Sequence, residues 1–109
     1  MEHSIDLGYL KQISFEDPQL LADMLDEWIQ DTRERLNKLT DTAHMADPKA
    51  AFTQVHNLKT SFFIFFHAPM IRLCEEYLRD ENSDYQHLVD QVFETISYIQ
   101  TEILPALRN

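Results

Sequence analysis

The sequence contains very little glycine and cysteine. Only one of its 109 residues is glycine and four are proline, so few positions favour breaks in regular structure. No glycine-rich loop of the kind that cradles nucleotide phosphates is present, so we expect no ATP binding and no kinase or ATPase activity. The single cysteine, Cys74, cannot form an internal disulfide, which favours a reducing compartment.

Positive charge is also scarce. Nine Lys and Arg residues stand against 19 Asp and Glu residues, which gives a formal net charge of −10. Such a surface repels phosphate backbones and anionic lipids, so we expect neither nucleic acid nor a membrane as a partner. Residues 1–14 include acidic side chains and no apolar run long enough for a signal peptide or a membrane span. The expected location is the cytoplasm.

The apolar residues that are present recur at three- and four-residue steps, which indicates amphipathic helices. Asp17-Pro18 and Asp47-Pro48 each place a capping carboxylate before a proline at the first helical position. We predict helices over residues 19–43, 49–66, 70–80 and 85–104, the last ending or bending at Pro105, and a short helix over residues 5–13. The predicted fold is all-α: one domain of residues 1–109, folded as an antiparallel four-helix bundle with a short additional N-terminal helix.

The apolar stripe of the helix over residues 49–66 places His56 at its edge. Its predicted members are Phe52, Val55, Leu58, Phe62 and Phe65. The run His56-Asn57-Leu58-Lys59-Thr60-Ser61, followed by Cys74, resembles the signature of histidine phosphotransfer domains, which opens with His-x-Leu-Lys-Gly-Ser. The likeness covers about residues 55–78, and the predicted helix layout is similar over nearly the whole chain.

This resemblance implies a phosphorelay intermediate. His56 would accept a phosphoryl group from a phosphoaspartate on one response-regulator receiver domain and pass it to another. Lys59 would offset the phosphoryl charge, and Thr60 and Ser61 would donate hydrogen bonds to it. The chain itself needs no cofactor in this interpretation, because the receiver domain brings the Mg²⁺. The partners would be receiver domains and a hybrid sensor kinase that carries one, and we expect a monomer.

Thr60 departs from the family pattern, which usually has glycine immediately beside the imidazole. A threonine there crowds the approach of a receiver domain, although its hydroxyl is also able to bond a phosphoryl oxygen. A second interpretation therefore has the same fold without phosphotransfer. In it the chain is a pseudo-phosphotransfer module that binds a receiver or a kinase without being phosphorylated.

Residues 62–66 are apolar on all sides of the predicted helix, and two interpretations are open. Either neighbouring segments enclose the whole run, which is the commoner case, or Phe63, together with Phe52, forms a docking or dimerisation patch below His56. Cys74 is expected in the core. Two Asp-x-x-His pairs, Asp41 with His44 and Asp84 with His87, lie near predicted helix ends, and we expect no metal site there.

Overall fold

The computed structural model describes residues 5–44, 47–79 and 85–108, and all regular structure within these ranges is helical. The first part of the chain forms α1 (Gly8–Ile13), α2 (Pro18–His44) and α3 (Pro48–Phe62), followed by the 3₁₀ turn η1 (Phe63–Phe65). The second part forms α4 (Ala68–Arg79), α5 (Tyr85–Tyr98), the π-helical segment η2 (Ile99–Ile103) and α6 (Leu104–Arg108). The predicted all-α fold class is confirmed.

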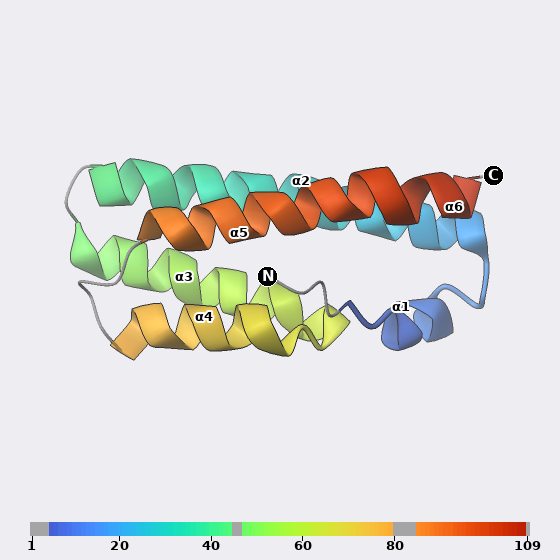
Figure 1. Cartoon of the computed structure of the whole chain (residues 1–109), viewed down its shortest axis with the longest axis horizontal. Helices are drawn as coiled ribbons and strands as arrows, with labels where there is room; N and C mark the ends of the chain where they lie inside the picture. The colour runs from blue at the N-terminus through green and yellow to red at the C-terminus, as the bar shows by residue number, and fades with distance from the viewer. Residues whose placement is uncertain (1–4, 45–46, 80–84, 109) are drawn as a thin grey trace.

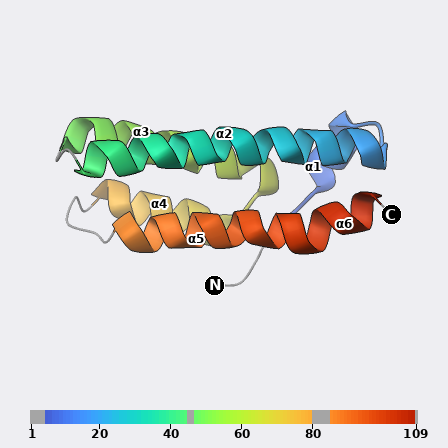
Figure 2. The ribbon, with the colours of Figure 1, turned by 90° about the horizontal axis from the view of Figure 1, so that it is seen from above.

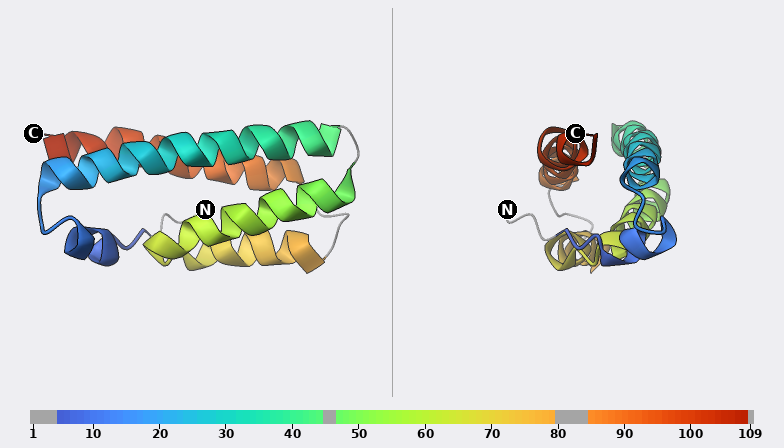
Figure 3. Two further views of the ribbon diagram at one scale, coloured as in Figure 1. Left: turned by 180° about the vertical axis from the view of Figure 1, so that it is seen from behind. Right: turned by 90° about the vertical axis from the view of Figure 1, so that its right-hand side faces the viewer.

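The long helices lie side by side, roughly parallel to the long axis of the molecule, and each runs opposite to the helix before it (Figure 1). Helices α2 and α3 form one layer, and α4 with α5 and α6 forms the other (Figure 2). Helix α2 packs on α3 and α6, α3 packs on α4, and α4 packs on α5. The short α1 lies beyond the end of α3, next to the first turns of α2 (Figure 3).

The two helix starts predicted from Asp-Pro pairs are both capped by the aspartate side chain. The Asp47 carboxylate accepts a hydrogen bond of 3.2 Å from the Ala50 N–H, and Pro48 opens α3. The Asp17 carboxylate likewise accepts from the Gln19 N–H at 3.0 Å. These bonds satisfy amide groups that have no partner within the first helical turn.

The predicted end of the helix over residues 49–66 is wrong by one turn. Helix α3 ends at Phe62, and Phe66 adopts a left-handed conformation with φ of 50°. A helix continued through residue 69 would drive the ring of Pro69 against the carbonyl group of Phe65, four residues earlier. That carbonyl oxygen instead accepts a hydrogen bond of 2.9 Å from the Asp6 N–H, which ties the chain before α1 to η1.

The last helix does not end at Pro105. The chain widens into the π-helical η2 just before the proline and continues helically as α6 to Arg108. A wider turn accommodates a residue without an N–H and keeps its ring off the preceding turn. Arg108 pairs with Asp26, and Arg33 Nη2 donates to Gln100 Oε1 at 3.4 Å, so two contacts hold this end against α2.

Trp28 on α2 joins the two helices of its layer. Its indole Nε1 donates a 2.9 Å hydrogen bond to the Ser61 carbonyl oxygen, and its ring lies 5.4 Å from the Phe62 ring and 4.7 Å from the Phe65 ring. Phe62 and Phe65 are fully buried. The prediction that Phe52 belongs to the inward stripe is wrong, because Ala51 is buried there and Phe52 is 46% exposed.

The two adjacent phenylalanines at the end of α3 should contribute very differently to stability. Phe62→Ala is expected to lower the free energy of unfolding by about 3–5 kcal/mol, since it leaves a cavity between α2 and α3. Phe63→Ala removes a half-exposed ring and should cost less than about 1 kcal/mol. Urea unfolding followed by circular dichroism measures both, and equal losses would contradict the assignment of Phe62 to the core.

Candidate functional site

His56 lies in the middle of α3 with an exposed side chain. Val55 and Leu58, the residues that flank it on the helix, are fully buried, so the core stripe turns the imidazole outward. Lys59 and Thr60 lie three and four residues further on and share its face. The structure thus brings together on one helix surface the imidazole, the ammonium group and the threonine hydroxyl that the sequence singled out.

Lys59 is held by α4. Its Nζ atom lies 3.4 Å from a carboxylate oxygen of Glu75, and its side chain retains 23% of its exposed area. An ion pair at this depth restricts a long side chain that would otherwise sample many rotamers. Glu75 is a part of the site that the sequence analysis missed. The only sequence signal for it is its position next to Cys74, the last residue of the motif.

The hydroxyl groups of Thr60 and Ser61 are both engaged within α3. Thr60 Oγ1 donates to the His56 carbonyl oxygen, and Ser61 Oγ donates to the Asn57 carbonyl oxygen, each at 3.1 Å. Ser61 is half-buried and its own carbonyl oxygen accepts from Trp28, so it lies on the side of α3 that faces α2. Thr60 is exposed beside His56. A hydroxyl has one proton to donate, so a bond from either group to a phosphoryl oxygen requires that proton to leave the helix carbonyl.

Two exposed aromatic rings lie on either side of His56 along the helix. Phe52 is four residues before it with 46% of its surface exposed, and Phe63 is seven residues after it with 49% exposed. The favoured expectation that neighbouring segments enclose the whole apolar run is therefore wrong for Phe63 and for Phe66, which is 61% exposed. The reason is the 3₁₀ turn, which sends Phe62 and Phe65 inward and Phe63 and Phe66 outward.

Cys74 is fully buried on α4, as expected for a core residue. Burial raises the pKa of its thiol to about 12, an effect that the positive charge of Lys59 opposes and the negative charge of Glu75 reinforces. A thiol with so high a pKa is not a nucleophile at neutral pH. Cys74 is therefore a core residue and not a nucleophile of the site.

His67 is a second histidine that the structure places in the interior. Its Nδ1 accepts a 3.3 Å hydrogen bond from the Met70 N–H at the start of α4, and its ring packs edge-on against Phe62 at 5.7 Å. It is fully buried. His67 thus caps α4 from within the core, and His56 is the histidine of this region that solvent reaches.

The Asp-x-x-His pairs form no cluster in the described structure. Asp41 and His87 are exposed, whereas Asp84 and the side chain of His44 lie outside the described residues. Among the residues described, no three His, Cys, Asp or Glu side chains gather closely enough to hold a metal ion. The helices within the described ranges also include none that is long and apolar enough to cross a membrane.

Comparisons with protein-family models, with curated proteins and with solved structures find no match to this chain. The geometry of the His56 face is therefore the basis for inferring a function. An imidazole on an open helix surface is accessible to a reactive group carried by another protein. The two flanking rings offer the apolar area that such a partner would cover.

Alkylation of Cys74 tests its burial and its raised pKa together. With a native pKa of about 12 against 9.0 for a free thiol, the thiolate fraction below pH 9 is lower by about a thousandfold. Because only the thiolate reacts, iodoacetamide at pH 8.5 should modify Cys74 in native protein at least about a hundred times more slowly than in urea-unfolded protein. The same shift stabilises the fold fully below pH 9, and this contribution is lost as the pH rises toward 12. Equal alkylation rates would contradict the assignment.

Proposed function

We propose that this chain is a histidine phosphotransfer domain that accepts a phosphoryl group on His56 from the phosphoaspartate of one receiver domain and passes it to another. The observation that supports this most directly is the exposed imidazole in the middle of α3, with Lys59 on the same face and Phe52 and Phe63 on either side. The fold that we propose with this function is an antiparallel four-helix bundle of α2, α3, α4 and the α5–α6 segment, with α1 as the additional helix.

The chemistry needs only a nucleophile and a compensating charge from this chain. A ring nitrogen of neutral His56 attacks phosphorus, the N–P bond forms as the bond to the aspartyl oxygen breaks, and the carboxylate leaves with the bonding electron pair. The receiver domain supplies the aspartate and the Mg²⁺. The transfer to the second receiver is the reverse reaction on a different aspartate, so one exposed histidine serves both steps.

Lys59 fits the role of charge partner, and Glu75 sets where its ammonium group starts. An ammonium group has three donors, so Lys59 is able to keep one bond to Glu75 while it donates to a phosphoryl oxygen on His56. Glu75 also competes with the phosphoryl group for the same positive charge. The net effect of this pair is a lysine held beside the site in the resting state.

Docking accounts for the exposed rings. Phe52 and Phe63 lie about 6 Å and 10 Å from His56 along the helix axis, by the rise per residue of an α-helix. A receiver domain seated over His56 would cover both rings, and aromatic side chains are enriched at the centre of such interfaces.

Thr60 supports a second candidate function, a pseudo-phosphotransfer module that binds a receiver or a kinase without being phosphorylated. Its side chain is exposed one turn after His56, where the family signature has glycine, and its hydroxyl proton is engaged by the His56 carbonyl oxygen. In this alternative the receiver still covers Phe52 and Phe63, but the added side chain keeps the phosphoaspartate from reaching the imidazole.

Label transfer from receiver domains phosphorylated on aspartate tests the proposed function. Wild-type protein should acquire acid-labile label, and His56→Gln should acquire none because the nucleophile is gone. His87→Gln is the matched control, since His87 is an exposed histidine on α5, and it should be labelled like wild type. Binding of receivers without label on any variant would favour the pseudo-phosphotransfer module. Label that persists on His56→Gln would overturn the assignment of His56.

Replacement of Thr60 separates its effect on catalysis from its effect on the helix. Thr60→Gly should raise the transfer rate, because it opens the approach to His56, while lowering the free energy of unfolding by about 0.5 kcal/mol, the difference between the helix propensities of threonine and glycine. Thr53→Gly is the matched control: Thr53 is also exposed on α3, and its hydroxyl also bonds back to a carbonyl four residues earlier. It should lose similar stability without any gain in rate. A rate for Thr60→Gly that matches the Thr53→Gly rate would show that Thr60 does not obstruct transfer.

A further inference from the structure

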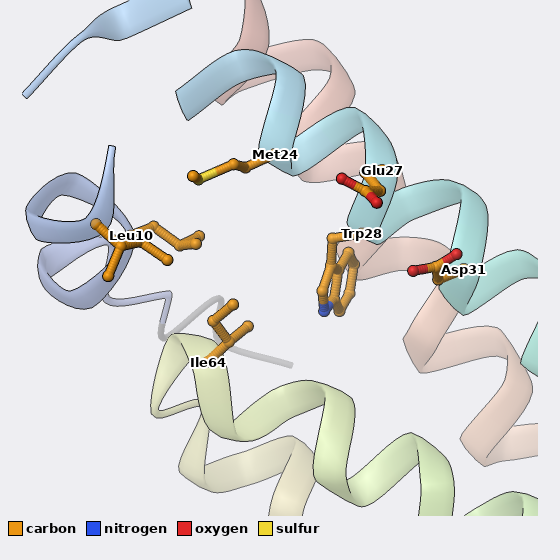
Figure 4. A pocket seen from close by; sticks show the side chains of 7 residues that line it. Leu10, Met24, Glu27, Trp28, Asp31 and Ile64 are labelled. Carbon is orange, nitrogen blue, oxygen red and sulfur yellow. The ribbon is translucent and has the colours of Figure 1, made fainter. Parts of the chain in front are cut away.

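A pocket of about 240 Å³ lies where α1, the first half of α2 and η1 meet. Leu10, Met24, Trp28 and Ile64 point toward one another across it, and Ile13 completes the apolar wall (Figure 4). The pocket lies next to the contact between α2 and α3 at which the Trp28 indole bonds the Ser61 carbonyl oxygen. Its walls therefore come from three separate segments of the chain.

Two carboxylates accompany the apolar wall, and both come from α2. Glu27 and Asp31 lie beside Trp28, one turn apart, and both are exposed (Figure 4). None of the residues that line the pocket carries a positive charge. An apolar cavity with an aromatic ring and two adjacent carboxylates complements a side chain with an apolar stem and a cationic end. Arginine matches this best, because its planar guanidinium stacks on aromatic rings and bonds two acceptors at once.

The pocket is close enough to His56 to fall under the same partner. Ile64 follows His56 by eight residues, which is about 12 Å along a helix. A protein interface of ordinary size covers about 800 Å² on each side, a patch wide enough to include both. A receiver domain that covers His56 and Phe63 would thus also reach the mouth of this pocket.

We propose that the pocket takes an arginine side chain of the docked receiver domain, and that Glu27 and Asp31 thereby select which receivers this chain serves. The partner named here rests on the proposed function, whereas the preference of the pocket for a guanidinium group does not. Glu27 and Asp31 take no part in the transfer step. They act on binding, as opposite charges across an interface set partner choice and association rate.

The pocket is tested first with a small probe and without any receiver. Trp28 is the only tryptophan of the chain, so its fluorescence reports on the pocket. Butylguanidinium should change this fluorescence saturably, and butylurea, its neutral analogue of the same shape, should not. The double variant Glu27→Gln/Asp31→Asn should lose the response. The control Asp90→Asn/Glu102→Gln removes the same charge from exposed positions on α5 and η2 and should keep it. A response absent from wild type, or equal for both probes, would overturn the pocket assignment.

Transfer kinetics then test the partner. With a receiver that labels His56, the pocket variant should raise KM by about three- to tenfold and leave kcat unchanged, whereas the control variant should behave like wild type. Replacing the receiver's surface arginines one at a time should identify one whose loss gives the same KM increase and adds nothing in the pocket variant. Equal KM values for the two variants would refute the docking role. Failure of every receiver to label His56 would refute the proposed function and the partner together, and the probe result would stand by itself.

Discussion

The packing of Trp28 between α2 and α3 is the contact on which the rest of this structure depends. One hydrogen bond to the Ser61 carbonyl oxygen and two ring contacts, with Phe62 and Phe65, set how α3 is rotated against α2. With Val55 and Leu58 buried by that rotation, the opposite side of the helix is left to solvent. The exposed position of His56 is thus a consequence of core packing two turns away, and the pocket beside Trp28 is a second consequence of the same contact.

At the end of α3, part of one apolar run is buried in the core and part is exposed on the surface. Phe62 and Phe65, three residues apart, are enclosed because the helix tightens into a 3₁₀ turn, and Phe66 then reverses the chain in a left-handed conformation. For a residue with a side chain, this conformation costs roughly 1–2 kcal/mol. The bond from Asp6 to Phe65 and the capping of α4 by buried His67 offset that cost locally. The same turn leaves Phe63 on the face of His56.

Electrostatics give the His56 face its particular character in a strongly acidic protein. With a net charge of −10, a phosphoryl group meets an unfavourable field over most of the surface. Lys59 is a local exception, and its ion pair with Glu75 restricts where its ammonium group lies. Glu27 and Asp31, at the pocket that Ile64 also lines, carry the opposite charge. A partner able to bind both must present an anionic reactive group and a cationic side chain with the same spacing, which is a more selective requirement than either alone.

The sequence by itself determines the helices and the residue types of the candidate site. The Asp17-Pro18 and Asp47-Pro48 capping pairs and the apolar steps of three and four residues are local signals, and the capping pairs place the starts of α2 and α3 to within one residue. The motif around His56 identifies the candidate phosphoacceptor. Only the tertiary structure decides that Phe52 and Phe63 are exposed, that Glu75 pairs with Lys59, and that Trp28 borders a pocket. Periodicity marks a helix face to about 100°, the angle between consecutive residues, whereas the covered side depends on the angle at which neighbouring helices cross. Contacts between α3 and α4, or between α1 and α2, join residues whose separation along the chain leaves no trace in the local pattern.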